Sequence, residues 1–162
     1  LVVVDRHNLA SAATRAVERA VLTEENHAYR EALQGRDWVG ALVDAQGQVQ
    51  CYGFVLHQSF YKRVLGEDDD VPMISNCFTP PAQRGQGHYP HMLRAVCEEL
   101  ARRGQARSII TCSIDNAASI RGIEKAGFRC VKQVTVWVLA ARLIVWRREL
   151  RCDHRAGGLE GR

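Results

Sequence analysis

A short stretch near the middle of the chain combines glycines, a basic residue and a helix start. The stretch is Arg84-Gly85-Gln86-Gly87-His88-Tyr89. It follows a strand-like segment that ends in Cys77, Phe78 and Thr79. Glycine lets the backbone turn with positive φ and approach a ligand closely. The first amides of a helix lack intrahelical partners and lie at the positive end of its dipole, so the stretch predicts a phosphate site.

The elements that must position this loop can be read on both sides of it. Residues 71–79 are predicted as a strand that Pro80-Pro81 ends, because proline cannot donate to a ladder. The helix after the loop has an apolar stripe of Met92, Leu93, Val96, Cys97 and Leu100. Residues 107–114 are predicted as a strand, and Asn116 as the N-cap of a second helix that Gly127 closes. A Gly-x-Gly pair alone is common in turns. The prediction of a phosphate site therefore depends on the order strand, glycine loop, helix, strand and helix.

In these motifs the chain resembles the GNAT acyl-CoA-dependent acyltransferases. The loop Arg84–Tyr89 is similar to the loop with which that family holds the coenzyme A pyrophosphate, and Asn116–Phe128 is similar to its second motif, which ends in Lys-x-Gly-Phe. The resemblance spans residues 71–135. It implies an α/β (α+β) fold with a mixed, mostly antiparallel sheet of six to seven strands, a central splayed parallel pair and about four covering helices.

The resemblance also implies a site, with acetyl-CoA as cosubstrate and its thioester between the parted strands 71–79 and 107–114. Backbone groups of Cys77, Phe78 and Thr79 would bind the pantetheine arm. The pyrophosphate would be held by amides of Arg84, Gly85, Gln86, Gly87, His88 and Tyr89. Asn116 and Ser119 would flank the pantetheine and phosphate, although a helix cap and a polar first-turn residue would be found there in any case.

Two positions depart from the family pattern. Tyr89 replaces a small residue, so its side chain is expected to point away from the phosphates while its amide still serves. Ile123 replaces the tyrosine that many relatives use as general acid, and the catalytic residues therefore stay unknown. Substitutes are the phenols Tyr52, Tyr61 and Tyr89 and the imidazoles His57, His88 and His91. Cys77 and Cys112 are interpreted more simply as inert thiols.

Composition sets the outer limits. The 162 residues predict one domain, 1–162, with a mobile tail from about residue 152. A net charge of +4 suits an anionic cofactor without predicting nucleic acid binding, and no apolar run is long enough for a membrane span. The six cysteines lack zinc-ligand spacing, so no metal is predicted. Reduced thiols in a cytoplasmic protein are the simplest interpretation, and the count of cysteines leaves disulfides open as the alternative.

The remaining chain predicts the other elements. Residues 1–6 are predicted as a strand and 9–33 as a helix or helix pair. Strands 38–44 and 49–60 should form a hairpin turned at Asp44–Gln48, followed by a loop over 61–70. The acidic run Glu67–Asp70 is either a solvated loop or an attractor of a cationic substrate. Residues 130–139 and 143–150 are predicted as two antiparallel strands. In the helix that follows the glycine loop, the side chains expected to face water are Glu98, Glu99, Arg102 and Arg103.

The leading prediction is transfer of an acetyl group from acetyl-CoA to an amine, or a hydroxyl, of a small-molecule or sugar/amino-acid-like acceptor, by direct attack in a ternary complex. Two alternatives stay open. One is a catalytically inactive GNAT-fold module that binds acyl-CoA or a partner, which the absent tyrosine at position 123 favours. The other is a basic interaction domain without coenzyme. The chain is compatible with a homodimer.

Overall fold

The computed structural model describes residues 1–5, 7, 12–24, 35–139 and 143–152. Its first half contains β1 (Val2–Val4), α1 (Ala12–Glu24), β2 (Trp38–Val43), β3 (Val49–Leu56), α3 (Phe60–Leu65) and β4 (Met73–Phe78). Its second half contains the 3-10 turn η1 (Pro81–Gln83), α4 (His88–Arg102), β5 (Ile109–Ile110), α5 (Ala117–Lys125), β6 (Lys132–Leu139) and β7 (Leu143–Arg151). The predicted helix 9–33 is represented by α1, and both its remaining residues and the tail after residue 152 lie outside the described residues.

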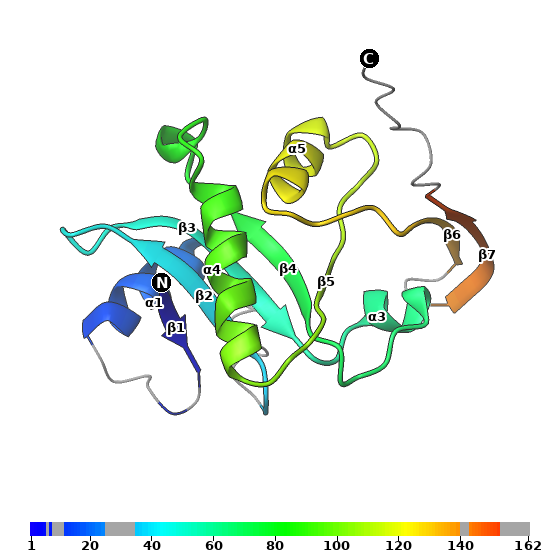
Figure 1. The fold of residues 1–162 in the computed structure, drawn as a ribbon, viewed down its shortest axis with the longest axis horizontal. Helices are drawn as coiled ribbons and strands as arrows, with labels where there is room; N and C mark the ends of the chain where they lie inside the picture. Colours follow the sequence, from blue (N-terminus) through cyan, green and yellow to red (C-terminus); the bar gives the residue numbers. More distant parts are fainter. Residues whose placement is uncertain (6, 8–11, 25–34, 140–142, 153–162) are drawn as a thin grey trace, which may run out of the picture.

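The strands form two sheets (Figure 1). The larger has the order β1-β2-β3-β4-β5, antiparallel except for the parallel pair β4–β5, and β6 and β7 form a separate antiparallel pair. The predicted mixed, mostly antiparallel architecture is thus confirmed. It differs in one respect, because the seven described strands are divided between two sheets and the parallel pair lies at an edge.

Helices α1 and α4 cover opposite faces of the large sheet (Figure 1). Alternate residues of a strand point to opposite faces, and the sequence separates them accordingly. Val39 and Phe54 pack with Val17 of α1 in one buried cluster. Trp38 packs with Val96 of α4 in a second cluster on the other face. The sheet is therefore a middle layer, with α1 on one side and α4 on the other.

Two glycines set the distance between α4 and the sheet. Gly40 and Gly53 are directly opposite one another in the β2–β3 ladder. A Cβ atom at Gly40 would lie 2.7 Å from Val96 Cγ2, and one at Gly53 would lie 3.0 Å from Met92 Cε. Carbon atoms in contact are usually about 3.5–4.0 Å apart, so α4 can lie this close only because both side chains are absent.

The predicted loop over 61–70 is wrong in its first half, which forms helix α3. Ser59 caps this helix by accepting a hydrogen bond from the Lys62 amide at 3.1 Å. Gly66 ends it in the left-handed conformation with φ 66°. Both are ordinary helix-boundary residues, but a helix of six residues has too little apolar periodicity to be recognised beside a strand.

Glu99 was expected to face water, and this prediction is wrong. Its side chain is buried and lies 2.7 Å from Arg103 Nε, with a second ion pair to Arg102. Arg103 also lies over the Trp38 ring, 4.9 Å from its centroid. The pairing makes burial of the carboxylate affordable, because a buried charge needs a partner.

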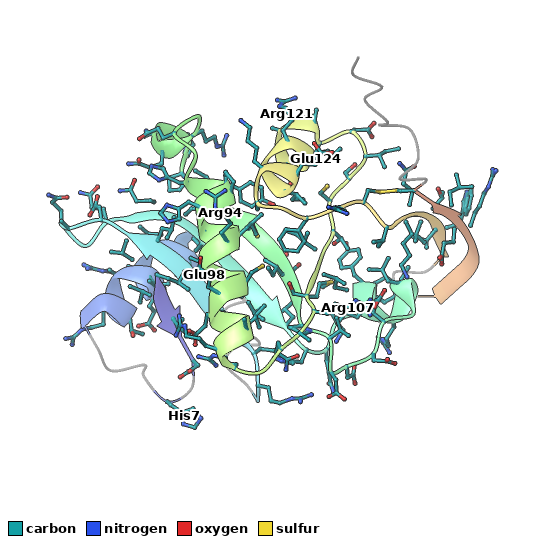
Figure 2. All side chains as sticks on the ribbon, in the orientation of Figure 1. His7, Arg94, Glu98, Arg107, Arg121 and Glu124 are labelled. Carbon is teal, nitrogen blue, oxygen red and sulfur yellow. A yellow bond between two sulfur atoms is a disulfide. The ribbon has the colours of Figure 1, made fainter. Side chains whose placement is uncertain are left out.

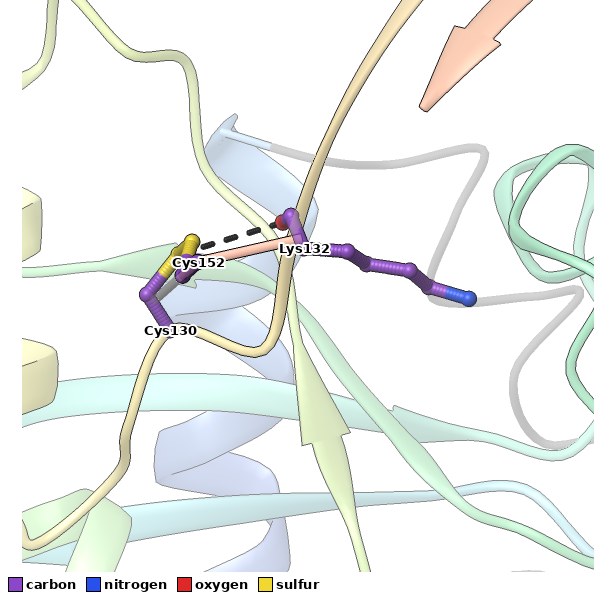
Figure 3. The surroundings of a disulfide bond; sticks show 3 residues. All are labelled: Cys130, Lys132 and Cys152. Carbon is purple, nitrogen blue, oxygen red and sulfur yellow. Dashed lines mark hydrogen bonds between the residues drawn. A yellow bond between two sulfur atoms is a disulfide. The ribbon is translucent and has the colours of Figure 1, made fainter. Parts of the chain in front are cut away.

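The prediction of six reduced thiols is corrected at two positions. Cys130 and Cys152 form a disulfide with a Cα–Cα distance of 5.9 Å. It closes the open end of the β6–β7 pair, beside the Cys152 amide, which donates to the Val131 carbonyl. The Cys130 sulfur lies 3.9 Å from the Lys132 carbonyl oxygen, and Figure 3 shows the disulfide beside Lys132. The other four cysteines are free.

Candidate functional site

The loop after β4 folds around two left-handed glycines. Gly85 and Gly87 have φ values of 77° and 80°, which glycine adopts without the steric cost of a Cβ atom. The Arg84 side chain stiffens the loop, since its Nε donates to the Thr79 carbonyl at 3.0 Å. Gln86 Nε2 likewise donates to the Ala82 carbonyl. Two side chains of the loop thus stabilise it by donating to backbone carbonyl oxygens, and they do not occupy its backbone N–H groups.

Five consecutive amides at this loop are open. Within the described residues, no protein acceptor lies in hydrogen-bonding position for the amides of residues 85–89, and no side chain caps α4. Arg84 differs from the prediction, because its amide donates to the Pro81 carbonyl at 3.3 Å. Adjacent free amides at the start of a 15-residue helix provide both donors and dipole for an anion.

The strands on either side of this region part, as predicted. β4 and β5 pair only through Met73 with Ile109 and Ile74 with Ile110. β4 continues to Phe78, whereas residues 111–118 leave the sheet and are exposed. The predicted strand 107–114 is therefore too long, because its second half has no partner. Beyond Ile74, β4 presents a backbone edge that no described strand occupies.

A bulge alters β4 beside this edge. Tyr52 pairs with Phe78 and Phe54 with Ser75, so β4 carries one extra residue opposite Gly53. Asn76 takes a left-handed conformation with φ 45° to fit it. Bulges twist a strand and redirect its side chains, and this one turns the Cys77 sulfur toward Gly53, where an added Cβ atom would lie 2.9 Å away. The sequence gives no signal for the bulge apart from a turn-forming asparagine within the strand.

Helix α5 begins across the gap from α4. The Asn116 carboxamide oxygen accepts from the Ser119 amide at 3.0 Å, which confirms the predicted cap. Arg94 of α4 donates to the Lys125 carbonyl at 3.0 Å and so joins the two helices. Figure 2 shows Arg94 on α4 and Arg121 on α5, both among the exposed side chains of this region. The two predicted motifs therefore meet at one place, with basic side chains around it.

Comparison with known proteins identifies this arrangement. The family profile described as an acetyltransferase (GNAT) domain matches residues 4–129. The chain belongs to the GNAT acetyltransferase family. The resemblance carried by the two motifs is thereby confirmed, and it extends from the first strand to the turn after α5.

Solved structures agree on the fold of this GNAT domain. The aminoglycoside N-acetyltransferase AAC(6')-Iy in complex with CoA has a TM-score of 0.54 and 20% identity, covering 74% of this chain and 88% of its own. The BH1408 protein from Bacillus halodurans, as a tetramutant, has a TM-score of 0.54 and 16% identity, covering 86% and 100%. AAC(6')-Ih from Acinetobacter baumannii, an aminoglycoside 6'-N-acetyltransferase, has a TM-score of 0.52 and 13% identity, covering 79% and 88%. No curated protein matches the chain.

Tyr89 occupies the position where the GNAT loop usually has a small residue. Its ring lies against Gly122 of α5, where an added Cβ atom would be 2.4 Å from Tyr89 Cδ1. Its hydroxyl lies 3.3 Å from Ser119 Oγ. Burial raises the pKa of Tyr89 above its usual value, so the phenol is protonated at neutral pH. The bulky residue is accommodated by a glycine 33 positions later, a pairing that sequence reasoning missed.

The other catalytic candidates of this GNAT domain are dispersed. Tyr52 is buried on the α1 side of the sheet, with its ring beside Phe54 and Phe78. Tyr61 is 61% exposed on α3. His57 lies at the end of β3, where its Nδ1 is 3.2 Å from an oxygen of Asp37. None of the three lies in the loop or in the first turn of either motif helix.

The remaining candidates lie closer to the loop. His88 is in the first turn of α4, and no described residue bonds its buried Nε2. His91 and Cys112 are exposed. Burial raises the pKa of the Cys77 thiol, and its hydrogen bond with Tyr89 opposes that shift. Cys77 is therefore a protonated, poorly reactive thiol, in agreement with its predicted inert character.

The acidic run lies at the other end of β4 from the loop. Glu67 forms ion pairs with Arg107 and with Lys132, the latter at 3.1 Å, and Asp70 lies 3.6 Å from Arg36. A strand of six residues is roughly 20 Å long. A polar cavity of about 400 Å³ near α3, lined in part by Phe60, is at this same end. Asp68, Asp69 and Asp70 are exposed, as predicted for a solvated loop, whereas the ion-paired Glu67 side chain is not. The distance of the run from the loop argues against its attracting a substrate to the gap.

Two further properties concern the described part of the chain. Within it, no group of three His, Cys, Asp or Glu side chains could hold a metal ion. None of its helices combines the length and the apolar character that crossing a membrane requires.

Proposed function

We propose that this GNAT domain transfers an acetyl group from acetyl-CoA to an amine or hydroxyl of a small-molecule, sugar-like or amino-acid-like acceptor, by direct attack in a ternary complex. The observation that carries the proposal is the row of open amides at residues 85–89 beside the parted strands. They supply donors for a diphosphate, and the unpaired edge of β4 supplies backbone groups for an extended arm.

Each predicted site residue has a role in this proposal. The backbone of Cys77, Phe78 and Thr79, on the free edge of β4, would bind the pantetheine arm. The amides of Gly85, Gln86, Gly87, His88 and Tyr89 would bind the pyrophosphate, with the exposed Arg84 guanidinium adding charge. Asn116 and Ser119 would border the arm from α5. The complex of AAC(6')-Iy with CoA supports coenzyme A as the ligand class.

A small basic acceptor fits the neighbours better than a macromolecule does. Two of the similar structures are aminoglycoside N-acetyltransferases. The net charge of +4 is mild for nucleic acid binding.

A cytoplasmic location belongs to the proposal too. The Cys130–Cys152 disulfide is the observation against it, since such bonds persist in oxidising compartments.

A second candidate function is an inactive GNAT module that binds acyl-CoA. The observation that favours it is Ile123, which packs against the buried cluster under α4 and offers no proton donor. Binding would then be retained without turnover. The two functions share the loop, so separate experiments on binding and on turnover are needed.

Binding is tested by thermal unfolding with acetyl-CoA. A ligand at about 100 times its Kd stabilises the folded state by about 2.7 kcal/mol, so a Tm increase of roughly 5–10 °C is expected for a domain of this size. Gly87→Glu should abolish the increase, because its carboxylate would face the phosphates. Gly87→Ala is the matched control, since it carries the same strain at φ 80° without the charge. Equal increases for both variants would show that the loop does not hold the coenzyme.

Turnover is tested by thiol release from acetyl-CoA with a panel of amines, amino sugars and aminoglycosides. Release above hydrolysis with at least one acceptor is expected. A Tm increase without thiol release on any acceptor would favour the inactive module. If acetyl-CoA causes neither a Tm increase nor thiol release, both proposed functions are wrong and only the fold assignment stands.

A further inference from the structure

The Tyr89 phenol lies where the segments around the gap converge. Its ring contacts Gly122 and its hydroxyl lies 3.3 Å from Ser119, both on α5. On the β4 side, the hydroxyl hydrogen-bonds the Cys77 thiol, and Cys112, two residues past the end of β5, is near enough to act on it electrostatically. The phenol thus lies between the face of β4 that α4 covers and the first turn of α5, beside the point where β4 and β5 part.

The other tyrosines and residue 123 offer no proton donor there. Cys77 points its sulfur toward Gly53 and Met92, on the side of α4. Ile123 has no polar atom. Tyr52 and Tyr61 lie in the opposite core and on α3. Among the tyrosines of the described residues, Tyr89 alone borders the gap.

The chemistry of thioester transfer requires such a donor. The leaving group is a thiolate, whose conjugate thiol has a pKa of about 8.5. Without a proton donor, its sulfur carries a full negative charge as it departs from the carbonyl carbon. In a site that excludes water, a hydrogen bond to that developing charge stabilises the transition state strongly. The Tyr89 hydroxyl is protonated throughout the neutral range, since phenols titrate near pH 10. Burial raises the pKa of Tyr89, which makes the phenol a weaker acid and favours a hydrogen bond to the developing thiolate over early proton transfer.

We propose that Tyr89 donates its hydroxyl proton to the coenzyme A sulfur as the thioester breaks, an inference that rests on the proposed acetyl transfer. The acceptor nitrogen forms a bond to the carbonyl carbon, and the carbon–sulfur bond breaks with its electron pair moving to sulfur. Tyr89 protonates that sulfur. The phenolate regains a proton from the acylated nitrogen through the Ser119 hydroxyl or solvent, so the products are the amide and the free thiol.

Tyr89→Phe tests this assignment in the full chain, because it removes one oxygen and keeps the ring against Gly122. With the best acceptor of the panel, kcat should fall about 100-fold, within the range that general acid catalysis contributes. The KM for acetyl-CoA should stay within about twofold, because the amide of residue 89 is unchanged. Tyr61→Phe removes the same oxygen from an exposed ring on α3 and should leave kcat unchanged.

A second donor separates catalysis from positioning. An aryl thioester of acetate releases a thiolate stable enough to leave without a proton, so Tyr89→Phe should lose little rate with it. An equal loss on both donors would assign Tyr89 a structural role and overturn the proposal. An unchanged kcat in Tyr89→Phe, or a raised kcat in Tyr89→Ala, would also overturn it, the latter by showing that the phenol obstructs the gap. In each of these cases the active wild type leaves the proposed function standing. A wild type inactive with every acceptor would overturn both proposals.

Discussion

Substitution of Gly122 by alanine tests the contact that places the Tyr89 ring. The added Cβ atom would lie 2.4 Å from Cδ1 and 2.8 Å from Cε1 of the ring. Carbon contacts are about 3.5–4.0 Å, so the ring or α5 must retreat by roughly 1 Å. Overpacking of this kind costs about 1–3 kcal/mol, and alanine in a helix regains about 0.5–1 kcal/mol over glycine. We therefore expect a net loss of about 1–2 kcal/mol in the free energy of unfolding.

The sign of this effect should depend on residue 89. In a Tyr89→Ala background the obstruction is gone, so Gly122→Ala should stabilise by about 0.5–1 kcal/mol through helix propensity alone. In a Tyr89→Phe background the ring remains, and the loss should persist. Urea unfolding of the six proteins gives these differences as a double-mutant cycle, with a coupling of about 2 kcal/mol expected. A stabilising Gly122→Ala in the wild type would show that the ring lies elsewhere.

Two further predictions concern the cysteines. After unfolding without reductant, alkylation should modify four thiols, because Cys130 and Cys152 are joined, and a mass increase for six would contradict the disulfide. Burial raises the pKa of the Cys51 thiol to about 11 from 9.0, so the folded state keeps its proton longer than the unfolded state does. The free energy of unfolding contributed by this thiol should be steady below pH 9 and fall by about 1.4 kcal/mol per pH unit between pH 9 and 11. Urea unfolding from pH 8 to 10.5 measures it, and Cys51→Ala should reduce the slope.

Local signals explain which parts of the site were predictable. The cap at Asn116, the left-handed Gly85 and Gly87, and the end of α4 before Gly104 each depend on residues adjacent in sequence. Such features are decided by one residue's backbone preference, so the sequence predicts them without knowledge of the tertiary structure. The row of open amides follows from them directly.

The parts that were wrong depend on contacts between distant residues. Glu99 has the charge of a surface residue, and only its pairing with Arg103 over Trp38 explains why it is buried. Cys130 and Cys152 become neighbours because β6 and β7 pair in register, which cysteine spacing does not indicate. The strand at 107–114 has the right composition throughout, but its length is limited by where β4 ceases to be a partner.

The Gly40–Gly53 pair connects the core to the site. α4 presents Met92 and Val96 to these glycines, and its close approach to the sheet fixes where its N-terminal turn lies relative to the end of β4. The bulge at Asn76 turns Cys77 onto the same surface, under the Tyr89 phenol. A side chain at residue 53 would therefore push both Met92 and Cys77 outward. The positions of the amides and of the phenol are consequences of one packing arrangement, in which small residues in the sheet allow α4 to approach the edge that β5 leaves free.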